Sequence, residues 1–193
     1  MQGGQVATMR THFAEQEIAY TGAELRSGWL RATFGLEGDA IAAFIGPCDV
    51  APEHMVDLVD LAAGARIFSR RMLHFIAEHA DPDLARAVLR QRLLVAIALE
   101  CIHRRSGTTA ARRECNDLYW RERKLSVSVA TTSPRSGLMH LGLNVIAAGA
   151  PVPAAGLEDL GIEPEPLARE IMAGYASEMA SVAAAQQKVR PVE

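Results

Sequence analysis

Lysine is almost absent from this chain, although basic residues are not. Of the 20 lysine and arginine residues in the sequence, only Lys124 and Lys188 are lysine. Lys124 follows Arg123 at the start of a strand-like stretch. An ammonium is a compact point donor that can follow a developing oxyanion or phosphate, whereas a guanidinium is a planar fork. Lys124 is therefore either a selected functional group or a surface lysine present by chance.

The chain is also poor in cysteine and in excess charge. Cys48, Cys101 and Cys115 are widely separated and form no CxxC motif, so we expect neither a disulfide framework nor a metal site. The formal net charge is -3, without the basic excess that marks nucleic-acid binding, so we expect no DNA partner. This cysteine usage favours a reducing cytoplasm.

The sequence has no secretory signal pattern and no hydrophobic run suited to crossing a membrane. Residues 136–157 contain no charged residue, but glycines and prolines interrupt the stretch repeatedly. This pattern predicts a strand followed by a loop, so we expect no membrane partner. A Walker loop, a Rossmann glycine fingerprint, an HExxH motif and a nucleophile elbow are missing as well.

The length and composition are those of an ordinary globular chain. With 193 residues, of which 49% are hydrophobic and 22% charged, the chain can bury a core. We expect one domain over residues 1–193. Residues 1–10 are expected to be loosely ordered.

Two long helices are predicted. In Asp81-Pro82-Asp83, a capping aspartate precedes a proline at the first helical position, and the helix should run to about Arg105. It is apolar around most of its circumference, which predicts a central helix packed on a sheet. The second helix should begin at Pro164 or Pro166 and dock through a stripe with four-residue spacing. The stripe comprises Leu167, Ile171, Tyr175, Met179 and Val182.

Shorter elements are expected in the first half of the chain. A short helix is predicted within residues 22–34, and residues 39–45 read as a buried strand that ends in a turn at Gly46-Pro47. Residues 67–68 and 72–76 read as two separate strand pieces.

Alternation is clearest over residues 124–131 and 138–145. In the first stretch, Leu125 and every second residue after it face one way, whereas Lys124 and every second residue after it face the other way. In the second stretch, every second residue from Met139 to Val145 lies on the apolar face. The short connection predicts an antiparallel hairpin whose register places Lys124 next to Asn144 or Val145.

The polar positions of this hairpin are expected to share one face. They are Lys124, Ser126, Ser128, His140 and Asn144. Gly142 should leave room for a ligand to approach the backbone. His140 is the leading acid-base candidate because it shares the face of Lys124. The alternative is an ordinary solvated face of an antiparallel sheet.

Other candidates lie outside the hairpin. Cys48 stands at a strand end beside Asp49, where a nucleophilic thiol is conceivable, but no cationic neighbour in sequence would lower its pKa. Arg66, with Arg70 and Arg71, could bind an anion. Three further histidines are candidates for acid-base work: His54, His74 and His79.

The segment from Asn116 to Val145 resembles the biotin and lipoate protein ligase superfamily. Asn116-Asp117-Leu118-Tyr119, followed by Arg123-Lys124-Leu125, is similar to its "NDIY…K" segment, and the eight-residue step from Asn116 to Lys124 fits without a gap. His140-Leu141-Gly142-Leu143-Asn144-Val145 is similar to the following "NV" strand. The likeness extends loosely over residues 20–185. Residues 44–50, 72–76 and 156–162 resemble an uncharacterised, mainly archaeal branch.

The resemblance implies an α+β fold with a mixed, mostly antiparallel sheet backed by helices, related to class II aminoacyl-tRNA synthetase cores. Lys124 then matches the catalytic lysine, which contacts the activated carboxylate and its phosphate or leaving group. The residues expected to bind or position substrate are Asn116, Asp117, Arg66, Ser126, Gly142 and Asn144, with His140 beside the lysine.

The sequence also departs from the superfamily. Adenylating members carry an arginine- and glycine-rich loop near the position of Gly64-Ala65-Arg66, of which only fragments remain here, so no cofactor is assigned and ATP use stays open. Val127 replaces a common glycine after the lysine. The Pro151-Val152-Pro153 stretch lacks the cysteine of octanoyl transferases, so their thioester mechanism is not carried over.

The sequence favours an enzyme: an acyl-group ligase or acyltransferase acting on a small carboxylic acid, its adenylate or its thioester. The alternative is a non-catalytic small-molecule-binding or assembly protein on a ligase-like scaffold. Action on a nucleobase or tRNA is a weaker option, which the net charge of -3 disfavours. An acceptor protein and a homodimer remain open as partners.

Overall fold

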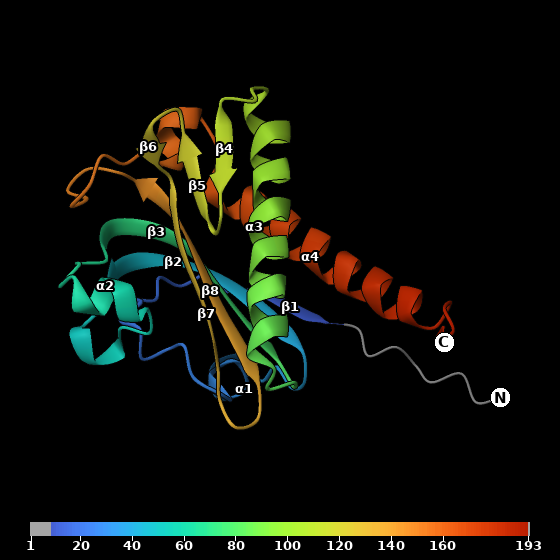
Figure 1. Cartoon of the computed structure of the whole chain (residues 1–193). Helices are drawn as coiled ribbons and strands as arrows, with labels where there is room; N and C mark the ends of the chain where they lie inside the picture. Colours follow the sequence, from blue (N-terminus) through green and yellow to red (C-terminus); the bar gives the residue numbers. More distant parts are fainter. Residues whose placement is uncertain (1–8, 193) are drawn as a thin grey trace.

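A five-stranded sheet forms the centre of the computed structural model, which describes residues 9–192 (Figure 1). The strands lie in the order β1-β2-β3-β8-β7. Their bounds are β1 Arg10–Phe13, β2 Ala40–Asp49, β3 Phe68–His79, β7 Ser126–Thr132 and β8 Gly137–Ile146. β1 and β2 pair in parallel, whereas β2–β3, β3–β8 and β7–β8 are antiparallel. The predicted mixed, mostly antiparallel sheet is therefore confirmed.

A second, smaller sheet stands beside the C-terminal part of α3 (Figure 1). It contains β4 Ala111–Glu114, β5 Asp117–Trp120 and β6 Arg123–Lys124, all antiparallel. The turns between its strands hold Cys115 and Arg121 at positive φ. The backbone N–H of Leu125 donates to the carbonyl of Leu118 at 2.7 Å, which ties the small sheet to the start of β7.

Two long helices cover one face of the large sheet (Figure 1). They are α3 Leu84–Ser106 and α4 Pro164–Gln186. The cap of α3 is Asp83, whose side chain accepts from the backbone of Arg86, and not Asp81 as predicted. Asp81 instead forms ion pairs with Arg86 and Arg90. α4 begins at the predicted Pro164.

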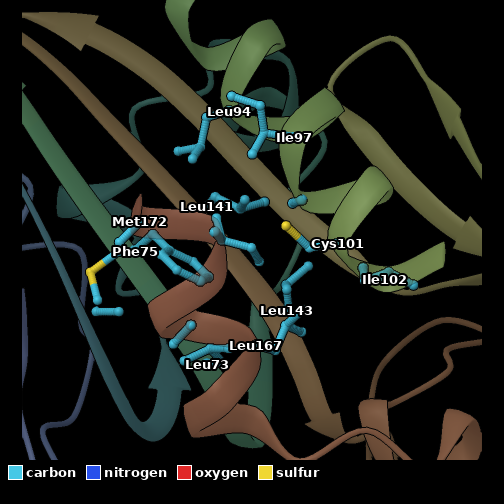
Figure 2. Close-up of a cluster of buried hydrophobic side chains, with 14 of the residues drawn as sticks. Leu73, Phe75, Leu94, Ile97, Cys101, Ile102, Leu141, Leu143, Leu167 and Met172 are labelled. Atoms are coloured by element: carbon cyan, nitrogen blue, oxygen red, sulfur yellow. The ribbon is translucent and has the colours of Figure 1, made fainter. Parts of the chain in front are cut away.

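The main hydrophobic core lies between these helices and the sheet, as Figure 2 shows. Leu73 and Phe75 of β3 and Leu141 and Leu143 of β8 meet the helices there. In α4 the predicted stripe is buried up to Tyr175, whereas Val182 is 39% exposed because the helix extends past the sheet. A fully buried Leu or Phe contributes roughly 1.5–3 kcal/mol, so this face supplies much of the stability.

A second hydrophobic cluster covers the opposite face of the sheet. It joins α1, Trp29–Phe34, to residues such as Phe44, Met72 and Ile76. α1 is shorter than the predicted helix because Gly28 before it has φ 77, a left-handed conformation that glycine adopts without steric strain. The remaining short elements are η1 Pro52–His54, α2 Leu58–Ala62 and η2 Leu157–Leu160.

Two strand predictions are corrected. β2 does not end at Gly46-Pro47 but continues to Asp49, because a register shift between Gly46 and Cys48 accommodates a proline that cannot donate to the ladder. β3 is one strand of 12 residues, and the arginines near Arg71 coincide with a register shift rather than a break.

The predicted loose leader covers residues 1–10. Residues 1–8 lie outside the described part of the chain. Met9 is buried and Arg10 opens β1, so the prediction is wrong for these two residues. No helix within residues 9–192 is long and apolar enough to cross a membrane.

Candidate functional site

Two adjoining pockets open on the sheet face opposite α3. The first, here called the histidine pocket, has a cavity volume of about 200 Å³. Its polar lining comes from Tyr20, His54, Asp57, Asp60, Asn116, Asp117, Lys124, Ser128 and His140. The second, the arginine pocket, measures about 150 Å³. Its lining includes Arg66, Ser126, Asn144 and the loop around Pro151. Concave sites of this kind suit small molecules.

Lys124 lines both pockets, together with Asp60, Ile67 and Val127. Its main chain is fixed on both sides: its N–H donates to the carbonyl of Pro153, and its carbonyl accepts from Ala155, each at 2.9 Å. Its side chain is half-buried, and Nζ lies 2.9 Å from Oδ2 of Asp117. The ammonium is therefore held at the junction of two cavities by the neighbouring strand.

The hairpin β7–β8 confirms the predicted register near the lysine. The backbone N–H of Asn144 donates to the carbonyl of Leu125, and its Nδ2 donates to the carbonyl of Lys124 at 3.4 Å. The lysine itself, however, belongs to β6 of the small sheet, where it pairs with Tyr119, and not to the same strand as Ser126.

The change of sheet at Leu125 corrects the predicted polar face. Ser126 pairs with Leu143 and Ser128 with Leu141, so both serines face the α3 side rather than the side of His140. The Ser126 hydroxyl accepts from the backbone of Leu118 at 2.7 Å. The serine side chains therefore join the two sheets. The alternation pattern predicted the wrong face for the two serines because the chain changes from one sheet to the other at Leu125.

Asn116 and Asp117 occupy different positions in the site. Asn116 is tied to Ser128: its Nδ2 donates to the serine carbonyl at 3.0 Å and its carbonyl accepts from the serine hydroxyl at 2.7 Å. The side-chain amide is thus already engaged, whereas the Asp117 carboxylate faces Lys124. Of the two, Asp117 has the geometry to position the lysine.

His140 forms a buried pair with His74 of β3. Nε2 of His140 lies 3.1 Å from Nδ1 of His74, and Nε2 of His74 lies 3.3 Å from the carbonyl oxygen of Gly46. Burial lowers the pKa of His74 from 6.5 to about 3. Burial, with His74 as a neighbour, lowers the pKa of His140 well below 6.5. Both rings are therefore uncharged at neutral pH.

Aromatic rings hold this pair in place. Tyr20 stacks on His140 with ring centroids 3.9 Å apart and an interplanar angle of 5°, and Phe44 stacks on His74 at 4.9 Å. Tyr20 also lines the histidine pocket. Burial raises the pKa of its hydroxyl above the ordinary value, so it remains protonated. Both rings are therefore buried against aromatic side chains, and His140 also lines the pocket.

The remaining predicted residues are more dispersed. Gly142 is buried, and Met72 with the His140 ring fills the space where a Cβ would project, so a ligand does not reach the backbone there. Arg66 is exposed, with Nη2 3.2 Å from Oδ2 of Asp49. Cys48 is fully buried in the second cluster; burial raises the pKa of its thiol to about 12, so the thiol is uncharged and lies outside both pockets.

Sequence reasoning missed three contributors to the site. Tyr20 comes from an irregular segment, Asp57 is the N-cap of the short helix α2, and Asp60 lies within that helix. Nothing in their local patterns signals a shared cavity. His74 was among the candidate histidines, and its place between Leu73 and Phe75 on a buried strand indicated that it faces away from the main core.

A family model described as "Domain of unknown function (DUF366)" matches residues 9–190. An uncharacterized protein from Methanocaldococcus jannaschii is 38% identical over 187 residues, which cover 93% of this chain and 84% of the relative. A solved structure described as a protein of unknown function from Pyrococcus horikoshi is 38% identical, with a TM-score of 0.92. That match covers 96% of this chain and 100% of the other.

More distant structures share the fold. The apo biotin protein ligase from Aquifex aeolicus has a TM-score of 0.55 at 15% identity, covering 90% of this chain and 69% of the ligase. A bi-partite lipoate protein ligase from Thermoplasma acidophilum has a TM-score of 0.56 at 13% identity, covering 89% and 83%. At these identities the likeness shows the fold alone, and it confirms the predicted ligase-like architecture.

Proposed function

This chain belongs to the family described as a domain of unknown function (DUF366), and we propose that it is an acyl-group ligase or acyltransferase. Its substrate is a small carboxylic acid, or the adenylate or thioester of that acid. The observation that carries the proposal is the position of Lys124 at the junction of two pockets, 2.9 Å from Asp117. Fold similarity to biotin and lipoate ligases supports the same class.

Lys124 would act through its charge. A tetrahedral acyl intermediate or a departing phosphate carries negative charge on oxygen, and a preorganised donor that meets this charge is worth about 3–4 kcal/mol. Two main-chain hydrogen bonds fix the lysine backbone, and Asp117 restrains its ammonium. The reorganisation that a flexible surface lysine would need is therefore largely avoided.

The arginine pocket suits the anionic part of the substrate. Arg66 lies at its rim, and the Asn144 side chain lies within it, next to the lysine carbonyl. The histidine pocket on the other side of Lys124 would hold the rest of the molecule. This division assigns a contact to each of Lys124, Arg66, Asn144 and His140.

The segment that the resemblance assigns to ATP keeps only fragments of the superfamily's loop. In the resemblance, the arginine- and glycine-rich loop of adenylating members lies near Gly64-Ala65-Arg66, and the residues just before this position carry Asp57 and Asp60. The Asp57 carboxylate accepts from the backbone N–H groups of Val59 and Asp60 and so caps the start of α2. The proposal therefore includes no step through ATP and favours an acyl group supplied in activated form.

The second candidate is a small-molecule-binding protein without catalytic activity. It is favoured by the charge pairing, since Lys124 already has Asp117 and Arg66 already has Asp49 as a counterion. These ion pairs would neutralise the two cations even when no anionic substrate is bound. Under this alternative the cavity would bind a metabolite and release it unchanged.

A ligand screen with product analysis separates the two candidates. Thermal shifts would be measured with ATP, acyl-adenylate analogues, biotin, lipoate and amino acids, and each mixture would be analysed by mass spectrometry. An acid or activated acyl compound that stabilises the protein and is converted supports the transferase. Stabilisation by one metabolite with no product supports the binding protein. No stabilisation by any carboxylate or acyl compound contradicts both.

A further inference from the structure

The hydrogen-bond chain through the two histidines determines which ring nitrogen carries each proton. The Gly46 carbonyl can only accept, so Nε2 of His74 carries a hydrogen and donates at 3.3 Å. A neutral ring carries one N–H, so Nδ1 of His74 is an acceptor. It lies 3.1 Å from Nε2 of His140, which must therefore be the donor. The one remaining nitrogen, Nδ1 of His140, is left as a bare acceptor.

This acceptor has contact with the histidine pocket. Within residues 9–192, no protein group forms a hydrogen bond with Nδ1 of His140. In this part of the chain, the fully buried polar side-chain atoms without a hydrogen-bond partner belong to Asp81, Arg90 and Trp120, and Nδ1 of His140 is not one of them. His140 lines the histidine pocket and retains 3% exposure. The free nitrogen is therefore reached from the cavity.

Three carboxylates stand out in the polar lining of the rest of the pocket. The carboxylates of Asp57, Asp60 and Asp117 line it, and the ammonium of Lys124 is paired with Asp117. Asp57 uses one oxygen to cap α2, and Asp60 has no side-chain partner among the described residues. A carboxylate end of a ligand would be repelled from this side of Lys124, whereas an N–H or O–H group would be bound.

We propose that the acyl group of the substrate carries an N–H or O–H donor at its far end, and that Nδ1 of His140 accepts this hydrogen bond. His74, held by the Gly46 carbonyl, is a positioning residue that fixes the acceptor form of His140. The inference names the substrate class of the proposed transferase site and rests on that function. A plain alkyl acid would leave Nδ1 unpaired and should bind at least about tenfold more weakly.

The proton arrangement can be read directly from ¹⁵N NMR of the histidine side chains in the full chain. Both rings should show a protonated Nε2 and an unprotonated Nδ1, unchanged between about pH 7 and pH 5. In His74→Phe the fixed tautomer of His140 should be lost, and in His74→Gln, which can both donate and accept, it should persist. A proton on Nδ1 of His140 in the parent protein overturns the inference, whether or not a ligand is known.

Binding is measured by calorimetry with matched straight-chain acids from butanoic to octanoic, each in a plain, an ω-hydroxy and an ω-amino form. The parent should prefer a donor-bearing acid at least about tenfold, and His140→Phe should bind that acid no better than the plain one. Equal binding of the three forms by the parent, or binding of none, overturns the inference.

A Lys124→Ala arm separates this inference from the proposed function. If Lys124→Ala weakens all acids equally and the parent does not discriminate between them, the inference fails and the function stands. If the parent discriminates but Lys124→Ala binds each acid as tightly as the parent, the lysine-centred function fails and the donor preference stands.

Discussion

Nζ of Lys124 and Oδ2 of Asp117 lie 2.9 Å apart on the adjacent strands β6 and β5. The two side chains are about one third and one fifth exposed, so solvent screens the pair and its direct stabilising effect is small, roughly 0–1 kcal/mol. The main effect of the pair is therefore on the position of the lysine side chain, not on stability. The pair sets the position of the ammonium at the junction of the histidine and arginine pockets.

Asp117→Asn should lower turnover far more than it lowers stability. Without the carboxylate the lysine side chain loses its restraint, and kcat should fall at least about tenfold while the unfolding free energy changes by less than about 1 kcal/mol. Steady-state kinetics and urea unfolding measure the two quantities. The matched control is Glu165→Gln, which breaks the exposed pair with Arg169 on α4. Equal kcat in both variants would contradict the placement role.

Tyr175→Phe should destabilise the attachment of α4. The Tyr175 hydroxyl lies 2.9 Å from Nε2 of His79, both side chains are buried, and Nδ1 of His79 lies 3.0 Å from Asp39. Removing the hydroxyl leaves His79 without a buried partner, at a cost of about 1–3 kcal/mol. Urea unfolding should show this loss, while Tyr119→Phe on the half-buried β5 should change little. An unchanged midpoint in Tyr175→Phe would contradict the role of this bond.

The buried histidine pair should make stability fall in mild acid. The folded pKa of His74 is about 3 and that of His140 is also well below 6.5, so the unfolded chain binds protons that the folded chain does not. Stability is complete above about pH 6.5 and declines below it, by about 1.4 kcal/mol per pH unit for each histidine. Urea unfolding between about pH 7 and pH 5 measures the slope.

The control for this pH dependence is the same experiment on His140→Phe. With one titrating ring removed, the slope below about pH 6.5 should shrink by about half. Asp39 does not confuse the comparison, because its hydrogen bond with His79 lowers its pKa from 3.8 and places its own effect at still lower pH. A slope that is unchanged in His140→Phe would mean that this ring does not titrate on unfolding as described.

Much of the fold follows from local patterns in the sequence. Alternation along β8 placed Leu141 and Leu143 in the core and His140 on the opposite face, and the short connection predicted the antiparallel pairing with β7. The stripe on α4 held as far as Tyr175. These features depend on neighbouring residues, so periodicity is sufficient to predict them.

The site was harder to predict because it depends on contacts distant in sequence. The change of sheet at Leu125 moved Ser126 to the other face, and no local signal marks a strand that leaves one sheet for another. The pair of His74 with His140 requires β3 and β8 to be neighbours, and Tyr20, which stacks on His140, comes from a segment far from it in the sequence. Pairing between distant segments is not encoded in local periodicity.

The most direct test of the account compares Lys124→Ala and Lys124→Arg with Lys188→Ala. Lys188 is the other lysine of the chain and lies exposed just beyond the end of α4. For the compound found by the ligand screen, calorimetry and mass spectrometry would measure binding and product formation. Lys188→Ala should behave as the parent. Lys124→Ala should lose turnover by at least about a hundredfold, and Lys124→Arg should recover little, because a planar fork cannot replace a point donor. Parental binding and turnover in both Lys124 variants would contradict the central claim.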